Sequence, residues 1–229
     1  MNTIVIAPEF CGPRDSGNGG YVCGLIANYA DFDSAVILRK PPPLSKPLSV
    51  ITVKDKVSLM DGDQLIGEAI PEILDLDTPP APDFNQAREA SGRYIGYENH
   101  VFPTCFVCGP DRHEGDGLRI FAGRVNGNER VAAPWIPADT LAGDDGLVRK
   151  EFHWAALDCP GYFSINDVIK KSVLGKMSAK VLQKVKPGEL CVITGWPIKH
   201  DGRKHFSGTA IFREDGSLAA IAHAIWIDI

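Results

Sequence analysis

Asp158 is the residue whose surroundings in the sequence most clearly suggest chemistry. It lies between Leu157 and Cys159 in the apolar stretch "AALDCPGYF". An unpaired carboxylate is costly to bury, so an acid in such a stretch is exposed, paired or functional. A carboxylate beside a substrate can activate water or attack a carbonyl carbon directly. The alternative interpretation is a helix cap or salt bridge ahead of Pro160.

The stretch "GNGG", which contains Asn18, Gly19 and Gly20, is a second candidate. An apolar segment with helical spacing follows it. A helix N-terminus offers free backbone N–H groups and the positive end of the helix dipole. Glycine lets a ligand approach these donors closely. Such a site suits a developing oxyanion, and we expect the N–H of Gly20 to hold it, with the N–H of Gly19 as a possible second donor. The alternative is a plain loop in which Asn18 caps the helix.

Cys105 and Cys108, in "CFVCGPD", have metal-ligand spacing. A structural zinc site usually draws four ligands from two such pairs, and the sequence has no second C-x-x-C pair. We take His113 as the one nearby histidine. We therefore predict no metal site and interpret the segment as a tight turn that leads into a strand. The other cysteines in apolar surroundings are predicted to pack as small hydrophobic residues: Cys23, Cys159 and Cys191.

Composition narrows the class of protein. The 229 residues are 44% hydrophobic and 23% charged, which is typical of a soluble globular protein. A net charge of −5 makes nucleic acid a poor partner. No apolar run approaches the roughly 18 residues of a membrane span, and "MNTIVIAPEF" has no signal-peptide pattern. With six cysteines and no secretory signal, we expect a cytoplasmic protein with reduced thiols that binds neither membrane nor nucleic acid.

Two stretches of the chain resemble each other. "SAVILRKPPPLSKPLSVIT" spans 34–52 and "SAKVLQKVKPGELCVIT" spans 178–194. Both begin with Ser-Ala, end with Val-Ile-Thr and contain prolines only near a central turn, as expected of strand, turn and strand. Asp-Gly turns between β-rich runs follow both copies. The final run, "LAAIAHAIWI", is apolar throughout and predicts a central strand.

A candidate helix precedes each copy. Apolar residues recur there at i, i+3, i+4 and i+7: Val22, Leu25, Ile26 and Tyr29, then Phe152, Ala155, Ala156 and Cys159. Pro160 should kink or end the second helix. Each half is thus predicted to be a helix with an antiparallel meander, in units 1–75 and 105–229, joined by a linker at 76–104 with a short helix near 86–93. Strands are also expected in "NTIVIAP", "GLRIFAGRV" and "ERVAAPWI".

A helix wrapped by an antiparallel sheet, present twice in one chain, resembles a double hotdog fold of the α+β class. "CFVCGPDRHEGDGLRI" and "DGRKHFSGTAIFREDGSLAAIAHAIWI" resemble segments of phenylacetyl-CoA-type acyl-CoA thioesterases. The resemblance covers almost the whole chain and is strongest in the second half. It implies that the two units pair internally as separate hotdog protomers do, and a further homo-oligomer of this pseudo-dimer is possible.

The resemblance also implies a catalytic arrangement. In that family a His-Gly-Gly signature at the helix start polarises the thioester carbonyl, and a carboxylate from the partner helix acts on it. Asn18, Gly19 and Gly20 match the signature with Asn in place of His, and Ala27 falls where that half's acid would be. Asp158 matches the carboxylate.

The second half has Arg149-Lys150-Glu151 in place of the glycines. The resemblance therefore implies one composite site, with donors from the first half and the acid from the second. Asn for His, and a proline two residues after the acid, depart from the family pattern.

Six further residues are candidates for substrate binding: Tyr21, His153, Trp154, Tyr162, Arg203 and Lys204. The tyrosines and Trp154 could border a pocket or pack in the core. His153 could be a general base or a hydrogen-bonded structural residue. The two basic residues could meet the phosphates of coenzyme A or simply face solvent.

The resulting hypothesis is an acyl-CoA or acyl-carrier-protein thioesterase that needs no cofactor beyond the CoA of its substrate. The alternatives are a non-catalytic acyl-CoA-binding or regulatory protein and, least favoured, an acyl-CoA hydratase, whose Asp/His motif is absent. Acyl chain length, carrier and pathway stay open.

Overall fold

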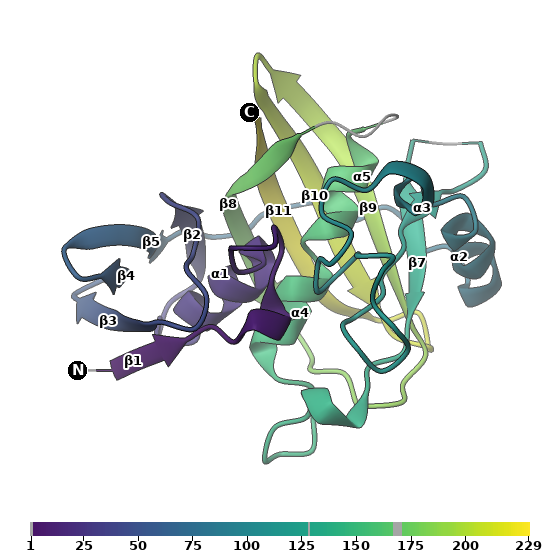
Figure 1. Cartoon of the computed structure of the whole chain (residues 1–229). Coiled ribbons are helices and arrows are strands. Elements are labelled where there is room, and N and C mark those ends of the chain that lie inside the picture. The colour runs from purple at the N-terminus through teal and green to yellow at the C-terminus, as the bar shows by residue number, and fades with distance from the viewer. Residues whose placement is uncertain (1, 128, 167–170) are drawn as a thin grey trace.

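An antiparallel sheet organises the molecule (Figure 1), and within the described part of the chain it has eleven strands. The computed structural model describes residues 2–127, 129–166 and 171–229. The strands of the first half are β1 (Asn2–Val5), β2 (Ser34–Leu38), β3 (Pro47–Val53), β4 (Lys56–Asp61) and β5 (Gln64–Pro71). Those of the second half are β6 (Gly123–Arg124), β7 (Val131–Trp135), β8 (Ser172–Val181), β9 (Cys191–Asp201), β10 (Lys204–Phe212) and β11 (Leu218–Asp228).

Outward from the middle of the sheet the two sides have equivalent strand orders, except that β6 at one edge has no counterpart. β2 pairs with β8 at the centre, and Ala35 lies opposite Ser178. Outward on one side come β5, β4, β3 and β1, and on the other β11, β10, β9, β7 and β6. The two similar sequence stretches therefore occupy equivalent places, as β2 with β3 and as β8 with β9. β11 lies between β8 and β10, which confirms the prediction of a central strand.

Helix α1 (Gly19–Ala27) confirms the first predicted helix. The second is split into α4 (Lys150–Ala156) and α5 (Cys159–Ser164). The break comes before Pro160, because proline fits in the first turn of α5, where its missing N–H is not needed. Asp158 lies in this break, between the end of α4 and the start of α5, and belongs to neither helix.

Two glycines of α1 let α4 approach unusually closely. A Cβ at Gly20 would lie 2.5 Å from Asp158 Cβ, and one at Gly24 would lie 2.6 Å from Glu151 Cα. The earlier glycine of α1 thus faces the end of α4, and the later glycine faces its start, so the two helices run antiparallel. This arrangement brings the N-terminus of α1 to Asp158, as the sequence hypothesis requires.

The connecting segment carries two short helices, α2 (Phe84–Ser91) and α3 (Gly96–Asn99). Asp83 and Gln86 form a capping box at the start of α2, in the place where a short helix was expected.

The expected strand "GLRIFAGRV" is reduced to β6. Its earlier residues pack instead against the loop that contains Cys105 and Cys108, here called the cysteine loop. The N–H groups of Leu118 and Ile120 donate there to the carbonyl oxygens of Phe106 and Val107.

One large hydrophobic core joins the helices to the inner face of the sheet in both halves. Its fully buried members come from both halves and include Val22, Ile26, Phe152, Leu157 and Met177. Within the described part of the chain, the helices are all too short or too polar to cross a bilayer.

Candidate functional site

The carboxylate of Asp158 is held by the first turn of α1. Its Oδ2 accepts a hydrogen bond from the backbone N–H of Gly20 at 3.0 Å and one from Asn18 Nδ2 at 2.9 Å. The acid comes from the second half of the chain and both donors come from the first. A side chain at Gly20 would displace the carboxylate, because its Cβ would lie 3.0 Å from Asp158 Cγ and 2.7 Å from the carbonyl oxygen of Trp154.

Asn18 uses every hydrogen-bonding group of its side chain. Oδ1 accepts the N–H of Tyr21 and caps α1, at 2.9 Å. Nδ2 donates to Asp158 Oδ2 and lies 3.8 Å from Cys105 Sγ. Because each atom of the amide has a partner that suits only it, the orientation of Asn18 is fixed and so is the position of the acid.

The other carboxylate oxygen, Asp158 Oδ1, is buried and accepts no hydrogen bond from a described residue. Asp158 is only 2% exposed. Burial raises its pKa to about 7, and the hydrogen bonds from Gly20 and Asn18 oppose part of that rise. A buried polar atom without a protein partner is rare in folded proteins, and at the wall of a cavity its partner can be a water molecule or a ligand.

Gly19 supplies the free donor at this helix end. The N–H groups of Gly20, Tyr21 and Val22 have acceptors in Asp158, the Asn18 side chain and the Asn18 carbonyl. Among the described residues, none accepts the N–H of Gly19, which lines the cavity beside the acid. The free donor expected at Gly20 therefore lies one residue earlier, because Gly20 is engaged with the acid.

A cavity of about 340 Å³ opens at this point, within the range of small-molecule sites. Asn18, Gly19 and Asp158 line it. Its walls are mainly apolar and include Leu38, Tyr162, Phe163, Leu174 and Trp226. Arg39 and Lys40, which the sequence did not single out, also border it. They follow β2 directly, and no sequence motif marks them.

Of the six predicted substrate-binding residues, Tyr162 lines the cavity and the others do not. Tyr21 is buried in an aromatic stack, with ring centroids 4.3 Å from Phe10 and 5.6 Å from Phe152. Trp154 is buried against Gly24 between the helices. Arg203 and Lys204 are exposed at the β9–β10 turn.

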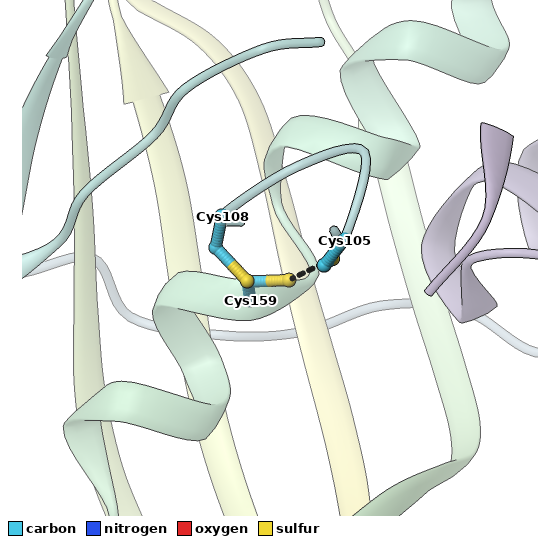
Figure 2. A group of neighbouring side chains, drawn as sticks. All are labelled: Cys105, Cys108 and Cys159. Carbon is cyan, nitrogen blue, oxygen red and sulfur yellow. Dashed lines mark hydrogen bonds between the residues drawn. The ribbon is translucent and has the colours of Figure 1, made fainter. Parts of the chain in front are cut away.

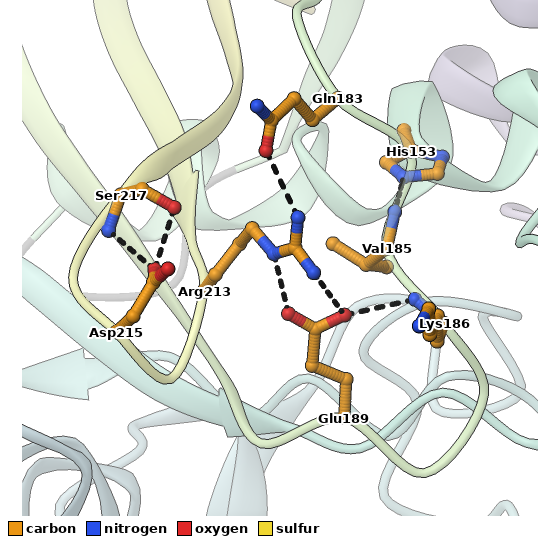
Figure 3. Close-up of polar contacts among 8 residues, drawn as sticks. All are labelled: His153, Gln183, Val185, Lys186, Glu189, Arg213, Asp215 and Ser217. Atoms are coloured by element: carbon orange, nitrogen blue, oxygen red, sulfur yellow. Dashed lines mark hydrogen bonds and ion pairs between the residues drawn. The ribbon is translucent and has the colours of Figure 1, made fainter.

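His153 is a structural residue in this arrangement. Its Nδ1 donates to the carbonyl oxygen of Arg149 at 3.1 Å. Its Nε2 accepts the N–H of Val185, also at 3.1 Å (Figure 3). Burial lowers its pKa to about 4, in keeping with a neutral ring that satisfies both partners. Both nitrogens are occupied, so His153 is not available as a base. The nearby Arg213–Glu189 ion pair holds the same loop.

The opposite end of the α1–α4 pair differs from the Asp158 end. Ala27 stands where a second acid would be, as expected from the sequence. Glu151 is buried there, accepts a hydrogen bond from Asn28 Nδ2 at 3.0 Å and lies 3.6 Å from Arg149 Nε. Both ends thus hold a buried carboxylate and an asparagine. At the Glu151 end, however, neither the acid nor its partners border the described cavity.

Three cysteines gather on the wall of the cavity. Cys105, Cys108 and Cys159 have their sulfur atoms within 4.8 Å of one another (Figure 2). His100, 3.2 Å from Cys108 Sγ through its Nε2, adjoins them, whereas His113 is exposed. Hydrogen bonding with Cys108 and Cys159 lowers the pKa of the Cys105 thiol, while burial raises those of the other two. The sequence interpretation missed this group because Cys105 and Cys159 are 54 residues apart.

The Asn18 contacts predict a stability difference between the two ends of α1. We expect Asn18→Ala to lower the free energy of unfolding by about 2–3 kcal/mol, since it removes an N-cap and a hydrogen bond to a buried carboxylate. Asn28→Ala removes only the bond to Glu151 and should cost roughly 1 kcal/mol less. Urea unfolding measures both variants, and equal losses would contradict the interlocking role of Asn18.

Comparison with solved structures finds proteins with a similar fold. The tesB protein of Mycobacterium avium subsp. paratuberculosis aligns with 99% of this chain and 92% of its own, with a TM-score of 0.63 and 12% identity. A thioesterase superfamily protein aligns with 56% of this chain, at TM-score 0.50 and 18% identity. That alignment spans 62% of its own length.

The PaaI protein of the Escherichia coli phenylacetic acid degradation operon aligns with 65% of this chain and 96% of its own, at TM-score 0.48 and 11% identity. No protein-family model and no curated protein sequence matches the chain. At these identities the first two likenesses show the fold alone, and the shared fold agrees with the one that the sequence resemblance implied.

Proposed function

We propose that this chain is a double hotdog thioesterase that hydrolyses an acyl thioester of coenzyme A or of an acyl carrier protein. In this proposal the two halves, divided near 1–75 and 105–229, arose by internal duplication and form one pseudo-dimer. The matching strand order on both sides of the β2–β8 pair supports it. So does the antiparallel packing of α1 against α4.

One observation carries the functional proposal: a buried acid from one half is hydrogen-bonded to the helix N-terminus of the other at the wall of a cavity. Asp158 Oδ1 has no partner among the described residues, and the N–H of Gly19 has none either. A general base or nucleophile and an oxyanion donor are the two groups that acyl transfer to water requires.

In the proposed reaction the thioester carbonyl oxygen accepts the N–H of Gly19. Asp158 Oδ1 either takes a proton from water, which attacks the carbonyl carbon, or attacks that carbon itself. The C–S bond then breaks, and the sulfur leaves as a thiolate that takes up a proton, supplied in the first route by the protonated Asp158. In the second route, water then hydrolyses the mixed anhydride between the acyl group and Asp158, which releases the acid and restores the carboxylate. Gly20 and Asn18 hold Oδ2 throughout, so Oδ1 stays directed for attack.

The lining of the cavity fits an apolar acyl group. Leu38 and Leu174 offer aliphatic surface, while Tyr162, Phe163 and Trp226 offer aromatic surface. The volume of about 340 Å³ suits a short or medium acyl or aromatic group. An acyl-CoA would then extend its charged nucleotide end toward the exposed basic residues after β2.

Lys40 is the basic residue best placed for that nucleotide. Arg39 forms an ion pair with Glu68, with Nη2 2.7 Å from Oε1. Lys40 is exposed, borders the cavity and makes no ion pair with a described residue. We expect Lys40→Glu to raise KM for an acyl-CoA about 3–10-fold with kcat unchanged, as expected for reversing one exposed charge contact.

The matched control for Lys40 is Lys204→Glu, an exposed lysine outside the cavity lining. Steady-state kinetics at two salt concentrations measures both variants, because salt should shrink an electrostatic difference. A KM increase in the Lys204 variant alone would contradict the placement of the nucleotide and favour the β9–β10 turn.

The proposed function is tested by hydrolysis of a panel of acyl-CoAs, from acetyl to long-chain and aromatic, followed through the loss of thioester absorbance. That signal does not depend on the protein's own thiols. Turnover with a preferred chain would support the thioesterase. Tight binding without turnover, for acyl-CoA and acyl carrier protein alike, would favour a non-catalytic acyl-CoA-binding protein. Hydration of an enoyl-CoA would favour the hydratase.

A further inference from the structure

The three cysteines on the cavity wall converge from two separate segments. Cys105 and Cys108 lie in the loop that follows α3, and Cys159 is the first residue of α5. The sulfur atoms of Cys105 and Cys159 are 3.8 Å apart, and all three lie within 4.8 Å of one another (Figure 2). Packing alone does not require three sulfurs to meet at one point. Cys191, by contrast, is a buried thiol of β9 that does not belong to this group of sulfur atoms.

This spacing matches a metal centre. Zinc binds thiolates at about 2.3 Å in a tetrahedral arrangement, which places pairs of sulfur atoms about 3.8 Å apart. The Cys105–Cys159 pair already has this separation. The distances from the Cys108 sulfur to the other two sulfurs exceed this separation by at most about 1 Å. A small rotation of the side chains would remove that difference.

Nitrogen donors surround the sulfur atoms. Asn18 Nδ2 lies 3.8 Å from Cys105 Sγ, within reach of a hydrogen bond to sulfur. His100 Nδ1 accepts the N–H of Phe102 at 2.8 Å, so in the neutral ring Nε2 carries the proton and donates to Cys108 Sγ at 3.2 Å. Donors aimed at sulfur favour thiolates, the form in which cysteine binds metal.

We propose that Cys105, Cys108 and Cys159 bind one zinc ion as thiolates, with water from the cavity as the fourth ligand. His100 keeps its proton and is a positioning residue, not a ligand. Each thiol releases its proton on binding. All three cysteines border the cavity, which gives the ion a path of entry. Soft sulfur ligands in a tetrahedral arrangement favour zinc over magnesium, calcium or manganese.

The zinc ion would fasten the loop of Cys105 and Cys108 to the start of α5, one residue after the acid. The proposal is independent of the thioesterase, because the sulfurs and their donors require no acyl substrate. It therefore stands or falls on metal binding alone.

The test is the metal content of the full-length, untagged protein, purified under reducing conditions without chelator and measured by mass spectrometry of the elements. We expect about one zinc per chain. Cys105→Ser, Cys108→Ser and Cys159→Ser should each lose most of it, whereas the control Cys191→Ser should retain it. His100→Ala should keep the ion but weaken its affinity about 10–100-fold, as expected for removing a hydrogen bond to a ligand.

A second readout does not depend on the folding of variants. Wild-type protein freed of zinc by a chelator is titrated with Co²⁺, and thiolate-to-cobalt charge-transfer absorption should appear and saturate at one equivalent. The proposal is overturned if folded wild-type protein contains no zinc and binds no Co²⁺. It is also overturned if peptide mapping finds a disulfide among the three cysteines, or if the serine variants retain the metal.

Discussion

Replacing Asp158 with Asn should reduce kcat for acyl-CoA hydrolysis by about 10²–10⁴-fold or more, the usual contribution of a general base. Asn has the shape of Asp, and its amide oxygen can accept the same hydrogen bonds from Gly20 and Asn18. It cannot take a proton from water or form a mixed anhydride with the acyl group. Binding should therefore remain while turnover is lost. The kcat comes from thioester absorbance, and affinity from titration with a non-hydrolysable thioether analogue.

Glu151→Gln is the matched control for this experiment. It also removes a buried carboxylate that accepts a hydrogen bond from an asparagine of α1, but at the end of the helix pair away from the cavity. Its kcat should stay within a few-fold of wild type. If Asp158→Asn keeps full activity, or if Glu151→Gln abolishes it, the acid has been assigned to the wrong end of the helices.

The second large effect is expected from Gly19→Pro, which removes the proposed oxyanion donor without displacing the helix. Proline is favoured at the first position of a helix, and Asn18, with ψ of 132°, already has the extended backbone that a following proline requires. Losing one oxyanion donor typically costs about 10²–10³-fold in kcat. The expected result is a folded protein with that loss and a similar affinity for the thioether analogue.

Gly19→Ala is the control for this variant, because it adds side-chain volume at position 19 but keeps the backbone N–H. Its Cβ would lie 3.0 Å from the Leu174 side chain, a contact that a small shift relieves, and its N–H remains. We expect this variant to keep most of the wild-type kcat. Equal losses in the Ala and Pro variants would mean that space, and not the donor, matters at Gly19.

Local sequence patterns accounted for much of the fold. The period of apolar residues located α1 and the α4–α5 segment, and the similar stretches 34–52 and 178–194 occupy equivalent strands. The expected strand at 117–125 was mostly wrong, because Leu118 and Ile120 bond to the cysteine loop, a contact between segments that apolar periodicity does not encode. The helix was expected to break at Pro160, but it breaks earlier, at Leu157 and Asp158, and Pro160 lies in the first turn of α5.

The meeting of the acid with the start of α1 was predictable, but the hydrogen bonds between them and most of the cavity lining were not. Spacing placed Asn18, Gly20 and Asp158 at meeting helix ends, and the structure brings them together. Spacing could not show that the N–H of Gly20 donates to Asp158, which leaves the N–H of Gly19 as the free donor. His153 and the cysteine group depend on contacts between distant segments, so their surroundings could not be read from neighbouring residues.

A crystal structure of the Asp158→Asn variant bound to an acyl-CoA tests the central claim most directly. The account predicts the carbonyl oxygen about 2.7–3.1 Å from the N–H of Gly19. It also predicts the carbonyl carbon within roughly 3.5 Å of the substituted side chain at position 158, or separated from it by one water molecule. A thioester bound elsewhere, or with its carbonyl turned away from Gly19 while that side chain stays in place, would contradict a site shared by the two halves.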